Sequence, residues 1–211
     1  MLTRQSHRHD RPGVPLLGRF RLSGGRAHEI CGAARRRLAL WLLAGVPGPV
    51  IWIRPAWHPD RLHMAGVRGE IDPSRLIMVT PERPEDLLWV MEEALRAGAV
   101  AAVIGDLPEA PGLTPIRRLH LAAEAGVAAH GQMALGLVLT PGGGGAPGVE
   151  SRWRLEPAHD TRAEGWHLSR LRARDGGPGD WLARRDRAGH VAICDRVVGP
   201  AWACVPCPKG K

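Results

Sequence analysis

Residues 71–107 read IDPSRLIMVTPERPEDLLWVMEEALRAGAVAAVIGDL and contain the clearest signals for the fold class. The apolar run at Leu76–Thr80 predicts a strand. A proline at the start, apolar residues at helical spacing and a glycine just past the end predict a helix over Pro84–Ala97. A second apolar run, Val100–Gly105, predicts the next strand. A strand–helix–strand unit of this length is typical of a parallel sheet covered by helices.

The same alternation continues on both sides of this unit. Further strands are predicted at Ala27–Cys31, Val50–Ile53 and Ala134–Thr140, and further helices at Arg35–Ala44 and Pro115–Ala125. The last of these helices is expected to begin behind Thr114 as its N-cap and to end before Gly126. The predicted fold class is therefore α/β, with a mostly parallel sheet flanked by helices.

The sequence pattern after residue 148 differs from the strand–helix alternation before it. The glycine-rich sequence PGGGGAPG at Pro141–Gly148 predicts a flexible loop or linker. Beyond it, alternating bulky and polar residues predict antiparallel strands at Ser151–Pro157, Trp166–Arg174 and Asp180–Arg185. Four regions are therefore expected: a basic flexible extension at 1–26, an α/β core at 27–148, a β segment at 149–195 and a flexible tail at 196–211.

Composition favours a cytoplasmic protein without a membrane partner. The 211 residues suffice for one α/β core with a smaller appendage. They contain no run of eighteen apolar residues, and the amino terminus is rich in Arg and His rather than apolar.

Four cysteines are too few for a fold held together by disulfides, and we expect them to be reduced. Cys204 and Cys207 form a CxxC, with only Cys194 and His190 as further candidate ligands. A single CxxC is weak evidence for zinc, so we favour the interpretation that these cysteines bind no metal.

The net charge of +8 is concentrated at the two ends of the chain. Residues 1–26 carry six arginines against one acid (+5), residues 27–150 eleven arginines against thirteen acids (−2), and residues 151–211 twelve basic residues against seven acids (+5). Such ends are typical of contact with a polyanion such as DNA, and solvated basic ends without a partner are the alternative. The candidate DNA contacts are Arg4, Arg8, Arg11, Arg19, Arg21, Arg26, Arg117 and Arg118.

The chain resembles the ImuA family of RecA-like accessory proteins in bacterial mutagenic repair. The resemblance is carried by HEIC (28–31), RRRLALWLLAG (35–45), PVIWI (49–53), the block at 71–107 and TPIRRLHLAAEAG (114–126). It continues less specifically through SRWRLEP and WHLSRLRARDGGPGDW, and spans roughly residues 27–192. It implies a RecA-like fold, an ImuB-like protein and an error-prone C-family DNA polymerase as partners, induction by the damage response, and RecA and DNA as further contacts.

Two alternative functions accompany this resemblance. Some proteins of the group carry SulA-like names because of distant kinship with a cell-division inhibitor, which makes inhibition of a cell-division GTPase the second hypothesis. The third is a residual RecA-like ATPase in which arginines at residues 35–37 replace the phosphate-binding lysine.

The motifs of an ATPase are incomplete in this sequence. A phosphate-binding loop needs glycines, a lysine and a Ser or Thr hydroxyl, and hydrolysis needs a group that orients water. The equivalent loop, CGAARRR, retains one glycine, and the segment RPAWH at 54–58 contains no acid. The sequence therefore predicts a non-catalytic protein without a cofactor. The degenerate remnant of the nucleotide site comprises Gly32, Arg35, Arg36, Arg37 and Asp106, the last at the position of a Walker B aspartate.

Two features of the sequence have competing interpretations. The arginines at 35–37 either hold an anion such as a DNA phosphate at a helix amino terminus or form a solvated basic turn. Trp153, Trp166 and Trp181 lie among arginines in the predicted antiparallel strands. They either stack on single-stranded bases or, as the favoured alternative, face the core.

Overall fold

The computed structural model describes residues 13–131, 133–160, 164–186, 189–196 and 202–205. Two strands, β1 (Gly13–Leu16) and β2 (Phe20–Ser23), form a separate hairpin. The other strands are β3 (Ala27–Cys31), β4 (Val50–Ile53), β5 (Leu76–Val79), β6 (Ala102–Asp106), β7 (Leu135–Thr140), β8 (Ser151–Pro157), β9 (Gly165–Ala173), β10 (Gly179–Arg185), β11 (Val191–Arg196) and β12 (Trp202–Val205). The α-helices are α1 (Arg35–Ala44), α2 (Met64–Arg68), α3 (Pro84–Ala97) and α4 (Leu113–His130).

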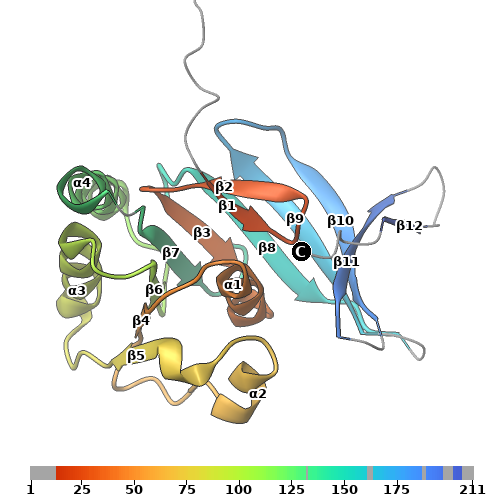
Figure 1. The fold of residues 1–211 in the computed structure, drawn as a ribbon, viewed down its shortest axis with the longest axis horizontal. Coiled ribbons are helices and arrows are strands. Elements are labelled where there is room, and N and C mark those ends of the chain that lie inside the picture. The colour runs from red at the N-terminus through yellow and green to blue at the C-terminus, as the bar shows by residue number, and fades with distance from the viewer. Residues whose placement is uncertain (1–12, 132, 161–163, 187–188, 197–201, 206–211) are drawn as a thin grey trace, which may run out of the picture.

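The larger sheet has ten strands in the order β12-β11-β10-β9-β8-β3-β7-β6-β4-β5 (Figure 1). Every neighbouring pair from β8 to β5 is parallel. Every pair from β8 to β12 is antiparallel. An α/β fold with a largely parallel sheet, flanking helices and antiparallel strands at the carboxyl end is thereby confirmed.

Apolar packing lies on both faces of the central parallel strands β6 and β7, because their runs of Val, Ile, Leu and Ala are buried on both sides. On one face, α1 packs with the hairpin through a cluster that includes Leu38, Trp41 and Trp52. On the other face, α3 and α4 lie side by side and contribute Met91, Leu95 and Ile116 (Figure 1). The carboxyl edge of the parallel strands, where the candidate site lies, is thus fixed from both faces.

The amino-terminal region folds more extensively than its composition indicates. In the β1–β2 hairpin, Leu16 and Leu22 are buried in the same core cluster as α1. The expected flexible extension is therefore wrong for residues 13–26, and residues 1–12 lie outside the described part. The signal for the hairpin is the alternation of Val14, Leu16, Phe20 and Leu22 around a turn.

The expected boundary at residue 148 does not separate two units. β3 pairs with β7 on one side and with β8 on the other, so one continuous sheet joins the strands before and after Pro141–Gly148. At the far edge, β12 pairs with β11, so residues 202–205 of the expected flexible tail form a strand. The expectation of reduced thiols is wrong for Cys194 on β11, which is disulfide-bonded, and is confirmed for Cys31 on β3, which is free.

Helix α4 is longer than the sequence predicts. It begins behind Gly112 rather than Thr114, and it ends at Gly131, which adopts a left-handed conformation. Gly126 lies inside the helix. A Cβ at this position would collide with the backbone oxygen of Leu95 on α3, so only glycine fits there. The glycine thus serves the close approach of α3 and α4 and does not terminate the helix.

Candidate functional site

The predicted remnant of a nucleotide site lies at the carboxyl edge of the parallel strands. The loop after β3 leads into α1, and Asp106 is the last residue of β6. The structure brings Gly32, Arg35, Arg36 and Asp106 together at this edge. In other α/β proteins, this edge, with the amino terminus of a helix, is where anionic ligands bind.

The loop after β3 is folded against β8. The Ala33 amide donates to Glu156 Oε2 over 3.1 Å, and the Ala34 amide donates to the Leu155 carbonyl, also over 3.1 Å. Gly32 has a φ of +94°, and a Cβ at this position would lie 2.5 Å from the Leu155 oxygen. Both amides that would wrap a phosphate are therefore already bonded, and one of them faces a carboxylate that repels anions.

Asp106 is only 4% exposed and is held by two arginines of α1. Arg36 donates from Nε to Oδ2 of Asp106 over 2.5 Å, and Arg35 Nε lies 3.5 Å from Oδ1. The cavity beside these residues, which Arg54 and His58 also line, measures about 10 Å³. That is room for about one water molecule, so side chains fill the position that a nucleotide would need.

Arg37 belongs to a different cluster. Its Nη1 lies 3.1 Å from Glu70 Oε1, and Arg185 of β10 pairs with the same carboxylate. The Arg37 guanidinium also lies 5.2 Å from the centre of the Trp166 ring. This arginine joins α1 to the antiparallel strands and does not contribute to an anion site with Arg35 and Arg36.

The structure describes five of the eight candidate DNA-contacting arginines. Arg4, Arg8 and Arg11 lie outside the described residues. Four of the other five are bound to partners within the molecule. Arg19 pairs with Asp195 at 2.7 and 2.8 Å, and Arg21 donates to the Gly13 carbonyl over 2.6 Å. Arg26 pairs with Glu124, and Arg118 pairs with Glu92 at 2.8 Å. Within the described part of the chain, Arg117 is exposed and forms no ion pair.

Two of the tryptophans in the antiparallel strands face the core. Trp153 and Trp166 are buried, so the interpretation of these two as a base-stacking surface is wrong. Trp181 is partly exposed, and its ring centre lies 4.6 Å from that of Phe20. The Arg170 guanidinium lies 5.7 Å from the Trp153 ring centre and 5.6 Å from that of Trp181. The Phe20 contact attaches the β1–β2 hairpin to the sheet, and Arg170 of β9 lies near tryptophans of the two neighbouring strands.

Glu29, on β3, organises the glycine-rich loop. The only sign of this role in the sequence is an acid within an apolar strand. Its fully buried carboxylate accepts hydrogen bonds from Thr140 Oγ1 at 2.7 Å, Gly145 N at 2.8 Å and Ala146 N at 3.1 and 3.2 Å. Arg152 supplies the opposite charge. The expected flexible linker is therefore held over part of its length to the centre of the sheet.

Two buried histidines flank this arrangement. His28 contacts Ser151 Oγ at 2.7 Å and the Ser23 carbonyl at 3.0 Å, and burial lowers its pKa to about 4. His120 of α4 accepts from the Ala27 amide at 3.3 Å, and its Nε2 lies 3.1 Å from the Gly148 carbonyl. Burial also lowers the pKa of His120. Both side chains are neutral connectors between elements.

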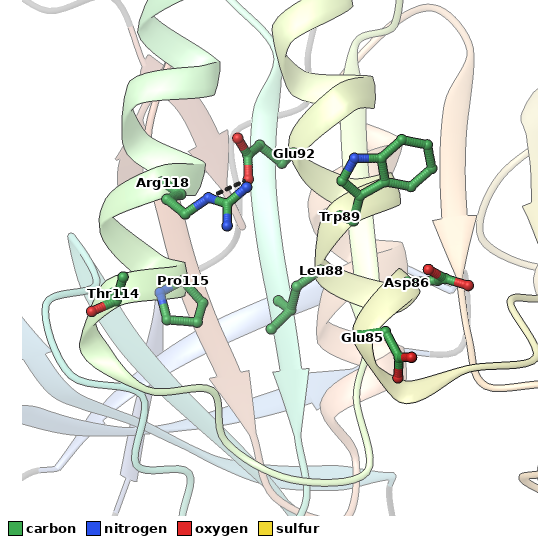
Figure 2. A pocket seen from close by; sticks show the side chains of 8 residues that line it. All are labelled: Glu85, Asp86, Leu88, Trp89, Glu92, Thr114, Pro115 and Arg118. Atoms are coloured by element: carbon green, nitrogen blue, oxygen red, sulfur yellow. Dashed lines mark ion pairs between the residues drawn. The ribbon is translucent and has the colours of Figure 1, made fainter.

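A separate groove lies between α3 and α4 (Figure 2). It has a volume of about 620 Å³ and is lined by Glu85, Asp86, Leu88, Trp89, Glu92, Thr114, Pro115 and Arg118. The Arg118–Glu92 ion pair bridges the two helices across it, and Arg96 pairs with the same glutamate over 2.5 Å. Trp89 points away from the bridge and is 56% exposed.

Comparison with known proteins gave no match to any family model and no match to a curated protein. Within the described residues, no three His, Cys, Asp or Glu side chains are grouped so that they would hold a metal ion. None of the helices in the described part of the chain is both long and apolar enough to cross a membrane.

Proposed function

We propose that this chain is a non-catalytic accessory protein of an error-prone DNA damage-tolerance complex, with a RecA-like core that binds an ImuB-like partner. The resemblance of residues 27–192 to the ImuA family supplies the identity of the complex and of its polymerase. A cytoplasmic location and contact with DNA and RecA are parts of the same proposal.

The observation that carries the proposal is the contact of Arg36 with the buried Asp106. At the position where a RecA-like ATPase holds phosphate and magnesium, this chain has guanidinium groups bound to the carboxylate, with about 10 Å³ left free. A magnesium ion would have to displace Arg36 to reach Asp106. Phosphoryl transfer depends on positioned metal and phosphate ligands, so this arrangement favours an adaptor over the residual ATPase.

A binding role is supported by the groove between α3 and α4. The α3–α4 groove combines exposed Trp89 with apolar and acidic side chains, and aromatic side chains in such settings dominate the energetics of protein interfaces. No feature of the described surface favours the SulA-like alternative in the same way.

The proposal is tested by co-expressing the full chain with an ImuB-like protein and, separately, with a cell-division GTPase. We expect a stoichiometric complex with the first and none with the second. The complex should also form when residues 1–12 are deleted, because the binding surface is assigned to the folded domain. Retention of the GTPase alone would replace the adaptor with the inhibitor hypothesis.

A further inference from the structure

We propose that the α3–α4 groove is a docking site for a basic amphipathic segment of a partner protein, with an apolar side chain inserted between the helices and Lys or Arg side chains beside it. The proposal rests on the adaptor role, which it deepens by naming the chemistry of the bound segment.

The apolar part of the groove is formed by Leu88 and Trp89 of α3 and Pro115 of α4. Leu88 points toward α4, and Trp89 exposes more than half of its side chain at the rim (Figure 2). A tryptophan on this outer side of α3 is not needed to pack α3 on the sheet, since Leu87, Met91 and Leu95 do so. Its large apolar ring is therefore available to a partner.

The charges around the groove select a basic partner. Glu92 is neutralised by Arg96 and Arg118, so it adds no net attraction. Glu85 and Asp86, in the first turn of α3, form no ion pair within the described part of the chain. A Lys or Arg of the bound segment can pair with these two carboxylates and also lie over the face of Trp89.

The walls of the groove are rigid enough to be preformed. Gly126 lets α4 approach the backbone of α3 closely, and the Arg118–Glu92 ion pair joins the two helices across the groove. A volume of about 620 Å³ lies within the range of specific binding pockets, roughly 300–1,000 Å³. An amphipathic helix or extended segment that inserts its apolar residues is the recurring occupant of such a groove.

The experiment is a selection of random 16-residue peptides on the full-length protein, followed by fluorescence-anisotropy titration of the enriched peptides. We expect enriched peptides to combine a net positive charge with a recurring large apolar residue. The double variant Glu85→Lys/Asp86→Lys and the variant Trp89→Ala should each weaken binding by at least tenfold. The matched controls Glu109→Lys and Leu121→Ala change exposed residues outside the groove and should retain binding within twofold.

Several outcomes would overturn the proposal: enriched peptides that are neutral or acidic, affinities that do not respond to the groove variants, or no enrichment at all. Sedimentation of the same proteins tests a second copy as occupant, because a dimer lost only in Trp89→Ala would assign the groove to self-association instead. Circular dichroism of each variant shows whether it is folded. No ImuB-like protein is used, so a failure here is distinguishable from a failure of the adaptor role.

Discussion

Arg36 and Asp106 meet at the carboxyl edge of the parallel strands, where Nε of Arg36 donates to Oδ2 of Asp106 over 2.5 Å. The two residues are 70 positions apart in the sequence. Their contact is an ion pair between α1 and β6, at the edge of the sheet where we propose that a nucleotide site has been lost.

Removing Arg36 should therefore destabilise the fold, because it leaves the buried Asp106 carboxylate with only the more distant Arg35. For Arg36→Ala we expect the free energy of unfolding to fall by about 1–3 kcal/mol, below the full value for a buried pair because Arg36 is partly exposed. Urea denaturation measures this change. Arg117→Ala, at an exposed site, should stay within about 0.5 kcal/mol, and equal effects of the two variants would contradict a structural role for the pair.

A second prediction concerns Glu29. Glu29→Gln keeps the size of the side chain but leaves Arg152 without its counter-charge and places an amide group among the Thr140, Gly145 and Ala146 donors. We expect a loss of about 3–5 kcal/mol in the free energy of unfolding and faster proteolysis within residues 141–148.

The control is Glu124→Gln, which removes a half-exposed partner of Arg26 and should change stability by less than about 1 kcal/mol. If Glu29→Gln were as mild as this control, the glycine-rich loop would not depend on the buried carboxylate.

Stability should fall as the pH drops below neutrality because of His28. Burial lowers its pKa from 6.5 to about 4, so between these values the unfolded chain binds a proton that the folded protein does not. The unfolded state is thereby favoured as pH falls through this window, by at most about 3 kcal/mol for this one group. Above pH 6.5 both states are neutral, and His28 makes no pH-dependent contribution.

Urea midpoints measured from pH 7 to pH 4.5 test this. In His28→Gln the decline with falling pH should be shallower than in the natural chain, although the variant is less stable at pH 7. Exposed His130→Gln should leave the decline unchanged. An undiminished decline in His28→Gln would assign the acid sensitivity to other groups, of which His120, with its lowered pKa, is the first candidate.

The regular elements could be predicted closely because their signals are local. The strands at 27–31 and 50–53 and the helices at 35–44 and 84–97 have the predicted bounds, since apolar runs, a proline at a helix start and a glycine after a helix end each act within a few residues. The prediction that the helix ends before Gly126 is wrong, because the role of this glycine depends on Leu95 of another helix. The hairpin at 13–23 was missed because arginines and glycines obscure its short apolar alternation.

The candidate site was only partly predictable. The residue types at 32–37 and at 106 predicted a degenerate nucleotide site, and the structure does bring Gly32, Arg35, Arg36 and Asp106 together. The partners that close this site, Glu156 and Leu155, come from a strand about 120 residues away, and no local pattern indicates such contacts. The groove between α3 and α4 likewise depends on how two separate helices pack.

DNA contact is predicted to depend on Arg4, Arg8 and Arg11 more than on the hairpin arginines, because Arg19 and Arg21 are bound within the molecule. The salt dependence of binding to a labelled single strand measures the number of phosphates neutralised, with a slope of about 0.7 per phosphate. Replacing the first three arginines with Gln should lower the slope by about 2, whereas Arg19→Gln/Arg21→Gln should lower it by less than about 0.7.

Equal slopes for the natural chain and the triple variant would show that these three arginines do not touch DNA. Absence of binding at low salt would restrict the chain to protein partners. Deleting residues 1–26 is unsuitable for this comparison, because it removes buried Leu16 and Leu22 together with the charges.

Steady-state ATP turnover by the full chain with magnesium, with and without single-stranded DNA, tests whether side chains close the proposed nucleotide position. The closed site predicts turnover no higher than the background of the Asp106→Ala variant under both conditions. DNA-stimulated turnover that is lost in Asp106→Ala would contradict the claim, because it would require Asp106 to leave Arg36 and serve catalysis.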